Sequence, residues 1–386
     1  MEKLQLNAQV EKKLKKGILL LEKDDLPFAK TQNGLVRLVS KSNQLLATAY
    51  LSEQNKGIGW VISRDEIDLT QAFFETLFLK ARACRLSYDE DPGTTAYRLF
   101  NQDGDGFGGL TIDRYGDFAV FSWYNVFVYD HKEMIIKAFQ KVFPEIKGAY
   151  EKYRFKEATN QSAHLYGQEA PDTFEVLEHQ VSYQVFLNDG LMTGIFLDQH
   201  AIRGRLADGF ATGKSVLNLF SYTAAFSVAA AMGGASQTTS VDLAKRSIEL
   251  SEAHFKANGL EMTNHHLMVM DVFDYYRYAK RHGLTYDIII IDPPSFARNK
   301  KQTFSVAKDY HRLVKEALAI LNPQGMLMLS TNASNLSIEQ FQKQIAKGLE
   351  KQEHTILTVD RLPSDFKITK NDERSNYLKV VTIKVL

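Results

Sequence analysis

The chain has 386 residues, a length that suggests two or three domains rather than one. Its 47 Lys and Arg residues are balanced by 46 Asp and Glu residues, which excludes a uniformly basic protein and leaves room only for local basic patches. Cys84 is the single cysteine, which excludes a disulfide framework and a cysteine-based zinc site. The sequence shows neither a signal peptide nor a membrane-spanning stretch, so we expect a soluble, cytoplasmic protein.

Residues 1–70 predict a small β-rich module. Short alternating apolar stretches between Val36 and Ser63 are separated by Asn and Gly, as in a series of paired strands. A lysine-rich stretch, residues 12–16, comes before them. It is either the solvated face of a helix or a phosphate contact, and the sequence leaves both open.

Residues 71–185 predict a central α+β domain. The apolar spacing over 67–87 indicates a helix, and we expect Cys84 on it as a small buried apolar side chain. The run NQDGDGFGG, residues 101–109, lacks the ligand spacing and terminal Glu of a calcium loop. It is therefore interpreted as a turn between two strands.

Residues 186–386 alternate apolar strands with helices. The expected strands cover 215–220, a segment ending at Asp242, and 266–271, 286–292, 325–331, 355–362 and 377–385. The expected helices include 224–232, 243–259 and 309–321, the last stopped by Pro323. Continuous apolar strands separated by helices predict a mostly parallel sheet buried on both faces.

Acidic residues follow three consecutive strands of this predicted sheet. Asp242, Asp271 and Asp292 stand at the carboxyl ends, where open α/β sheets bind ligands. The first could accept hydrogen bonds from ribose hydroxyls, the second from an adenine amine, and the third could lie at the reacting end. Together they predict a nucleoside site.

The turn after the first strand decides which nucleoside fits. A dinucleotide needs glycines that let backbone N–H groups approach the pyrophosphate. The segment SYTAAFS, residues 221–227, has none. An adenosine ligand without phosphates needs no such cradle, so S-adenosyl-L-methionine fits better than NAD.

The DPPSF motif, residues 292–296, follows the fourth strand. Two consecutive prolines stiffen the backbone and remove two N–H donors, which leaves carbonyl acceptors beside Phe296. An acceptor-lined wall next to an aromatic ring suits a planar base, by stacking and by hydrogen bonds to its exocyclic groups. The motif is therefore a candidate catalytic wall.

These motifs resemble those of class I S-adenosylmethionine-dependent methyltransferases of large-subunit ribosomal RNA. The likeness rests on VLNLFSYT (216–223), the acids at 242 and 271, DPPSF and TGIFLDQH (193–200). It implies a PUA module at 1–70, a central domain at 71–185 and a Rossmann-like domain at 186–386, whose last strand is antiparallel. It also implies S-adenosyl-L-methionine as cofactor and ribosomal RNA as partner. The oligomeric state stays open, with a homodimer as one option.

The resemblance also assigns site residues. The cofactor would be bound by Phe196, Asp198, Gln199, Asn218, Phe220, Ser221, Tyr222, Thr223, Asp242, Asp271 and Asp292. Catalysis would involve Asp292, Pro293, Pro294, Phe296 and Asn332.

The chain departs from the family pattern in two places. Ala224 and Ala225 stand where relatives usually carry glycines, which puts affinity for the methionine end in question. Relatives that methylate cytosine C5 need a thiolate after the fifth strand, but Thr331 and Asn332 stand here. Guanine N7 has its own lone pair and needs only positioning, so a ring nitrogen is favoured over cytosine C5.

The expected partner is RNA. We expect basic residues to flank the crevice without matching acids, as phosphate contacts would. They are Arg298, Lys300, Lys301, Lys308, Arg312, Lys315, Lys367, Lys370 and Arg374. Two alternatives stay open: a methyltransferase acting on protein or a small molecule, and a non-catalytic RNA-binding protein on the same fold.

Overall fold

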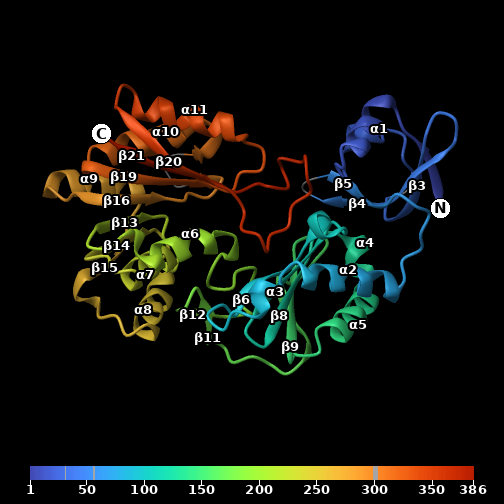
Figure 1. The fold of residues 1–386 in the computed structure, drawn as a ribbon, viewed down its shortest axis with the longest axis horizontal. Helices are drawn as coiled ribbons and strands as arrows, with labels where there is room; N and C mark the ends of the chain where they lie inside the picture. The colour runs from blue at the N-terminus through green and yellow to red at the C-terminus, as the bar shows by residue number, and fades with distance from the viewer. Residues whose placement is uncertain (31, 55–56, 299–302) are drawn as a thin grey trace. The chain divides into compact units, whose positions relative to one another are not determined.

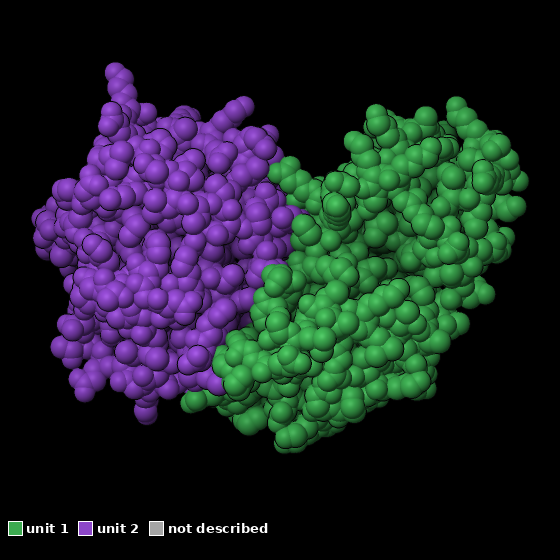
Figure 2. Space-filling view, viewed as in Figure 1, with its two compact units in different colours: residues 1–176, 185–193, 364–375 green, residues 177–184, 194–363, 376–386 purple. Residues whose placement is uncertain are grey.

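The computed structural model describes residues 1–30, 32–54, 57–298 and 303–386. The chain forms two compact units, which Figure 2 colours separately. Unit 1 contains residues 1–176, 185–193 and 364–375, and unit 2 contains 177–184, 194–363 and 376–386. The domain boundaries expected near residues 70 and 185 stay predictions.

The first sheet of unit 1 has the strand order β1-β3-β4-β5-β2. Its strands are β1 (Glu2–Gln5), β2 (Leu20–Leu21), β3 (Gly34–Val39), β4 (Leu45–Gln54) and β5 (Gly57–Ser63). Helix α1 (Ala8–Lys15) begins at Asn7, whose side chain accepts a hydrogen bond from the Val10 N–H. Val10 and Leu14 bury the apolar face of α1 against this sheet, as the β-rich module predicts.

The second sheet of unit 1 has the order β10-β9-β8-β7-β6. Its strands are β6 (Ala96–Asn101), β7 (Leu110–Tyr115), β8 (Phe118–Trp123), β9 (Gly148–Tyr153) and β10 (Ser162–Gly167), with helices α2 (Gln71–Ala83), α3 (Leu86–Asp89), α4 (Val126–Asp130) and α5 (Lys132–Val142). Tyr50 and Trp60 of the first sheet belong to the same apolar core, and the Tyr50 hydroxyl donates to the Gly108 carbonyl over 2.7 Å. The two sheets therefore share one core.

Two expectations for residues 67–109 can be compared with the structure. Cys84 is exposed just after α2, so the prediction of a buried cysteine was wrong: the helix ends at Ala83 and turns the thiol outward. The glycine-rich run forms a short 3-10 turn at Gln102–Asp105. The Asp105 carboxylate in that turn forms a buried ion pair with Arg85 at 2.7 Å.

Unit 2 contains a seven-stranded sheet of order β15-β14-β13-β16-β19-β21-β20 (Figure 1). Its strands are β13 (Ser215–Leu219), β14 (Gln237–Asp242), β15 (His265–Val269), β16 (Tyr286–Ile291), β19 (Leu321–Thr331), β20 (His354–Asp360) and β21 (Lys379–Val385). The pairs from β15 to β19 are parallel, and β21 runs antiparallel to both neighbours. This confirms the predicted α/β class and Rossmann-like sheet.

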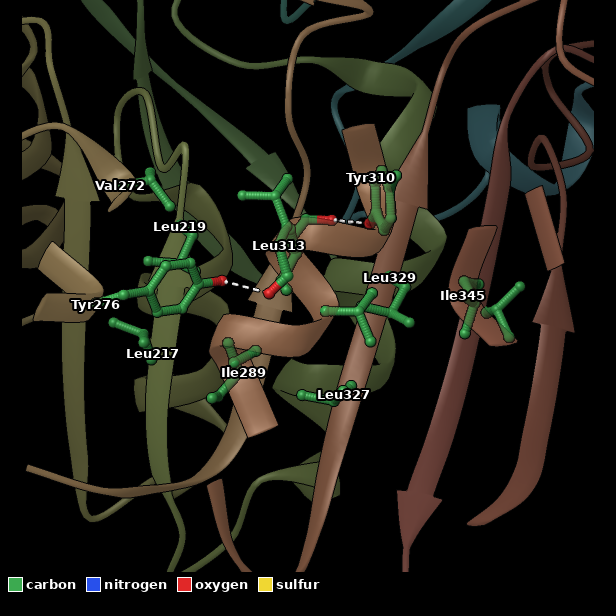
Figure 3. Packing of buried hydrophobic residues seen from close by; sticks show 14 of the residues in the cluster. Leu217, Leu219, Val272, Tyr276, Ile289, Tyr310, Leu313, Leu327, Leu329 and Ile345 are labelled. Carbon is green, nitrogen blue, oxygen red and sulfur yellow. Dashed lines mark hydrogen bonds between the residues drawn. The ribbon is translucent and has the colours of Figure 1, made fainter. Parts of the chain in front are cut away.

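Helices cover both faces of this sheet. They are α6 (His200–Arg205), α7 (Ala225–Met232), α8 (Ser247–Ala257), α9 (Val272–His282), α10 (Val306–Leu318) and α11 (Ile338–Leu349). Figure 3 shows one core, in which Leu217, Ile289 and Leu327 meet side chains of α9, α10 and α11. The alternate residues Val216 and Ile288 pack with α6 and α7 on the other face. Burial on both faces explains the continuous apolar strands.

Short elements complete the fold. They are β11 (Phe174–Glu178), β12 (Val181–Val185), β17 (Phe296–Arg298) and β18 (Thr303–Ser305). The predicted helix 309–321 was wrong at its end: α10 stops at Leu318, and Pro323 lies inside β19. The β16–β19 register shifts between Tyr286 and Ile288, and such an irregularity accommodates a proline within a strand. Among the described residues, no helix is long and apolar enough to cross a membrane.

Candidate functional site

The turn after β13 is held in an unusual backbone conformation. Phe220, Tyr222 and Ala224 have φ values of 58°, 49° and 60°, a region that side-chain-bearing residues rarely adopt. The Tyr222 N–H donates to Asp242 Oδ2 at 2.8 Å, and the Thr223 hydroxyl donates to the Gly194 carbonyl at 2.7 Å. Strain of this kind persists only where surrounding contacts impose it, and it often marks a binding site.

His254 of α8 supports the same turn, and sequence reasoning missed it. Its ring nitrogens lie 3.0 Å from the Thr223 carbonyl oxygen and 2.9 Å from the Gln184 carbonyl oxygen. Burial lowers the pKa of this imidazole. In the sequence His254 is one polar residue in an amphipathic helix, so only tertiary structure reveals its role.

Ala224 stands where relatives usually carry a glycine, and the effect of this replacement on stability can be tested. We predict that Ala224→Gly raises the free energy of unfolding by about 0.5–1 kcal/mol, because glycine adopts positive φ without strain. Ala225→Gly is the matched control, since that residue begins α7 with ordinary helical geometry and should lose stability. Thermal unfolding of both variants measures this, and equal destabilisation would show that Ala224 is unstrained.

Asp242 and Asp271 have different surroundings at their strand ends. The two carboxylate oxygens of Asp242 accept the N–H groups of Tyr222 and Ala244, each at 2.8 Å. A shallow hollow lies beside it, lined partly by Ser221, Tyr222 and Met268. Asp271 instead caps α9 by accepting the N–H groups at positions 273 and 274. The structure thus gives Asp271 a capping role that leaves its predicted adenine contact a proposal.

A polar cluster surrounds Asp292 at the end of β16. Gln199 Nε2 donates to Asp292 Oδ2 at 3.2 Å and to Ser330 Oγ at 2.8 Å. Burial, together with the nearby charge of Asp198, raises the pKa of Asp292 to about 6. The Tyr377 hydroxyl donates to Asp198 at 3.0 Å. The structure therefore brings together the predicted residues 198, 199 and 292.

This cluster offers acceptors that the described residues do not satisfy. Gln199 Oε1 and Asn218 Oδ1 are buried without a hydrogen-bond partner among them. The unpaired Gln199 oxygen next to Asp292, with the charge of Asp198 nearby, favours a ligand that is cationic and rich in N–H or O–H donors. S-adenosyl-L-methionine has a sulfonium, an amine and ribose hydroxyls, so the residues present fit it.

The aromatic residues of the predicted site differ in exposure. Phe196 is 47% exposed, and its ring centroid lies 5.4 Å from that of Tyr222. Phe220 is turned toward the apolar core, where its ring faces Phe304. A side-chain contact between Phe220 and a cofactor is therefore not supported, although its backbone shapes the strained turn.

The DPPS turn meets the loop after β19. Pro293 is buried, whereas Pro294 and Asn332 are exposed and the Phe296 ring is 62% exposed. The Ser295 hydroxyl donates to Asn332 Oδ1 at 2.8 Å. This bond orients the amide through its oxygen, and the amide N–H groups of Asn332 are donors close to an accessible aromatic ring.

The expectation of unmatched basic residues around the crevice was wrong for three of them. Lys315 pairs with Glu350 at 2.5 Å, and Arg374 pairs with Glu22 at 2.7 Å. Lys367 pairs with Asp105 at 3.9 Å. Lys300 and Lys301 lie outside the described residues, as does the side chain of Arg298. Lys367, Lys370 and Arg374 belong to unit 1. Arg312 lies over the Phe273 ring, with its guanidinium carbon 5.1 Å from the ring centroid.

Comparison with protein families identifies the family of this chain and the reaction that it catalyses. A family described as S-adenosylmethionine-dependent methyltransferase matches residues 147–372, more than half of the chain. The chain belongs to this family. It is therefore a methyltransferase that uses S-adenosyl-L-methionine, which supplies a methyl group on a sulfonium. A PUA-like domain matches residues 4–64.

Three of the following four relatives are similar over the whole length of this methyltransferase. "Putative ribosomal RNA large subunit methyltransferase YwbD" of Bacillus subtilis is 42% identical over 100% of both chains. Ribosomal RNA large subunit methyltransferase I of Klebsiella pneumoniae is 33% identical over 76% of this chain and 74% of its own. The crystal structure of SMU.776 complexed with SAH is 60% identical over 100% of both chains, with a TM-score of 0.97. A Streptococcus mutans methyltransferase structure is 58% identical over the same coverage, with a TM-score of 0.95.

Proposed function

We propose that this methyltransferase modifies a base of large-subunit ribosomal RNA, and that the target is a ring nitrogen such as guanine N7. The main support for an RNA substrate is the full-length similarity to YwbD, which includes the PUA-like module as well as the catalytic unit. A protein or small-molecule substrate would leave that module without a role. With ribosomal RNA as its substrate, the enzyme would act in the cytoplasm.

We propose that different strand-end residues bind different parts of the cofactor and the target base. The turn 220–224, with Asp242, would hold the adenosine end of the cofactor, while Gln199 and Asp292 would orient the reacting end. The exposed Phe296 ring would stack on the target base. Methyl transfer to a ring nitrogen needs only that the lone pair be held in line with the methyl group, so positioning is the main contribution of these residues.

The Ser295–Asn332 hydrogen bond supports guanine in particular. With its oxygen bonded to Ser295, Asn332 would offer its N–H donors to the base. Guanine presents two acceptors, O6 and N7, on one edge, whereas the amino group of cytosine is a donor. A donor aimed at O6 would leave N7 beside the methyl group.

Mass-spectrometric mapping of bases in 23S ribosomal RNA, with and without the protein, tests the proposal. We expect a 7-methylguanine that depends on the protein. A protein-dependent 5-methylcytosine would refute the target atom and keep the substrate class. Unchanged RNA together with a methylated protein or small molecule would refute the substrate. Titration calorimetry with S-adenosyl-L-methionine separates both cases from a non-catalytic RNA-binding protein.

Cys84→Ser should retain methyl transfer at close to the wild-type rate. The thiol is exposed at the end of α2 in unit 1, and Thr331 and Asn332 stand where a cytosine-C5 enzyme of this family carries its nucleophile. RNA containing 5-fluorocytosine, which traps thiolate-dependent enzymes, should give no covalent adduct on a denaturing gel. An adduct that disappears in the Ser variant would establish cysteine catalysis.

A further inference from the structure

The segment Ser364–Ser375 leaves the catalytic sheet and folds into unit 1. It connects β20 to β21, which are neighbours in the unit 2 sheet, by a detour of twelve residues. Figure 2 colours this segment with unit 1, and Figure 1 draws it in red. A direct turn between two antiparallel strands needs only a few residues, so the detour calls for a separate explanation.

Buried contacts anchor the segment on the second sheet of unit 1. Arg85 Nε donates to the Asp365 carbonyl at 3.0 Å, and Asn101 Nδ2 donates to the Lys367 carbonyl at 2.8 Å. A Cβ added to Gly104 would lie 1.9 Å from that same carbonyl oxygen, so glycine is required there for the close approach. The backbone of the segment is therefore fixed.

The other side of the segment touches the N-terminal module. Asn371 Nδ2 donates to the Lys16 carbonyl at 3.0 Å, just after α1. The Lys370 carbonyl oxygen lies 3.8 Å from the position of a Cβ on Gly17. Residues 355 positions apart in the sequence thus form one continuous surface.

This surface carries four exposed lysines: Lys12, Lys15, Lys16 and Lys370. Within the described part of the chain, none of them forms an ion pair or a side-chain hydrogen bond. Lys16 is the C-cap residue of α1 with helical backbone angles, so it lies on the same side of the helix as Lys12, four residues earlier. We call these four residues the lysine surface.

The acids of the same two segments do not neutralise it. Asp25, Asp365 and Asp372 are buried, and Glu22 lies between Lys13 and Arg374, 2.7 Å from each. The remaining acids of these segments are the half-buried Glu11 of α1 and the exposed Asp24 and Glu373, against four exposed, unpaired lysines. The surface is therefore locally positive although the whole chain has a formal charge of only +1.

We propose that the lysine surface binds the phosphate backbone of the RNA substrate, and that the detour 364–375 exists to complete it. The proposal rests on the proposed RNA substrate and adds where unit 1 holds it. A rigid backbone with mobile ammonium groups suits phosphates, which need charge without base recognition. Neither segment supplies all four charges alone.

Filter binding of full-length protein to transcribed 23S ribosomal RNA across 50–200 mM KCl tests this. The test variant replaces the four lysines by glutamine, which keeps helix propensity and removes charge. We expect affinity at 50 mM to fall about tenfold or more, and the slope of log affinity against log salt to flatten by about three, since each phosphate contact contributes roughly 0.7–0.9.

A control variant removes four other exposed lysines that have no ion pair within the described chain: Lys80, Lys137, Lys343 and Lys347. It should keep the wild-type slope. Both variants should keep the wild-type unfolding temperature and affinity for S-adenosyl-L-methionine. Equal slopes in the two variants would refute the lysine surface. Wild-type protein that fails to bind or methylate the RNA would refute the proposed function instead.

Discussion

Replacing Asp292 by asparagine should reduce methyl transfer by at least a hundredfold while RNA affinity changes little. The carboxylate lies at the end of β16 and accepts a hydrogen bond from Gln199 Nε2, so it helps to fix the amide whose Oε1 has no partner among the described residues. Asparagine keeps the size but removes the charge next to Asp198. Loss of orientation at a reacting centre commonly costs this much or more. Single-turnover transfer of a labelled methyl group measures it.

The raised pKa of Asp292 adds a pH signature. Burial first, and then the charge of Asp198, lifts this pKa from its ordinary 3.8 to about 6, so the folded state binds the proton more tightly than the unfolded state. Wild-type stability relative to the Asn variant should therefore fall as pH rises from about 4 to about 6, by roughly 3 kcal/mol at most. If the ionised form is required, transfer should rise over the same range.

Asp287→Asn is the matched control, because this residue lies on the same strand far from its carboxyl end. Its carboxylate accepts the Ser215 N–H at 2.8 Å and the Asn322 side chain at 2.9 Å. The variant should lose stability and keep the transfer rate and its pH dependence. If Asp292→Asn transfers methyl groups as fast as Asp287→Asn, Asp292 has no role in the reaction.

The sequence predicted the sheet well because its strands are buried on both faces. Consecutive residues of β13 and β16, such as Val216 with Leu217 and Ile288 with Ile289, pack into different cores, which requires continuous apolar runs. The strand-end acids were found for the same topological reason. The local sequence pattern was sufficient to predict the candidate site residues that follow directly after a strand.

Features that depend on tertiary contacts were not predictable. His254 matters because its ring reaches two carbonyls from distant segments, and nothing in its own helix marks that. The positive φ of Ala224 follows from the contacts of the whole turn, since alanine by itself avoids it. The 364–375 segment looks like an ordinary loop in the sequence, and only the structure places it in unit 1.

The shared core of unit 1 also changes how the N-terminal module should be tested. Deleting residues 1–70 would remove Tyr50, which stacks on Phe127 at 4.5 Å, and Trp60 from the core around α2 and β8. The remaining domain would lose stability, and weaker RNA binding would then have two explanations. Charge substitutions at the surface of the module avoid this problem.

Asp242→Ala should weaken the binding of S-adenosyl-L-methionine by about 10–150-fold. Removal of a charge-assisted hydrogen bond typically costs about 1.5–3 kcal/mol, which corresponds to that range. The same carboxylate holds the Tyr222 N–H, so the strained turn should also loosen and the unfolding temperature should fall. Asp242→Asn keeps one acceptor oxygen and should lie between wild type and Ala. Titration calorimetry on folded protein gives the affinities.

Asp271 provides the comparison that separates a cofactor contact from a helix cap. Asp271→Ser retains an oxygen that can cap α9, so it should leave stability nearly unchanged, whereas Asp271→Ala should cost about 1 kcal/mol. If Asp271 also contacts the cofactor, both variants should lose affinity; if it only caps the helix, Ser should bind like wild type. Unchanged affinity in a folded Asp242→Ala protein would remove Asp242 from the cofactor site.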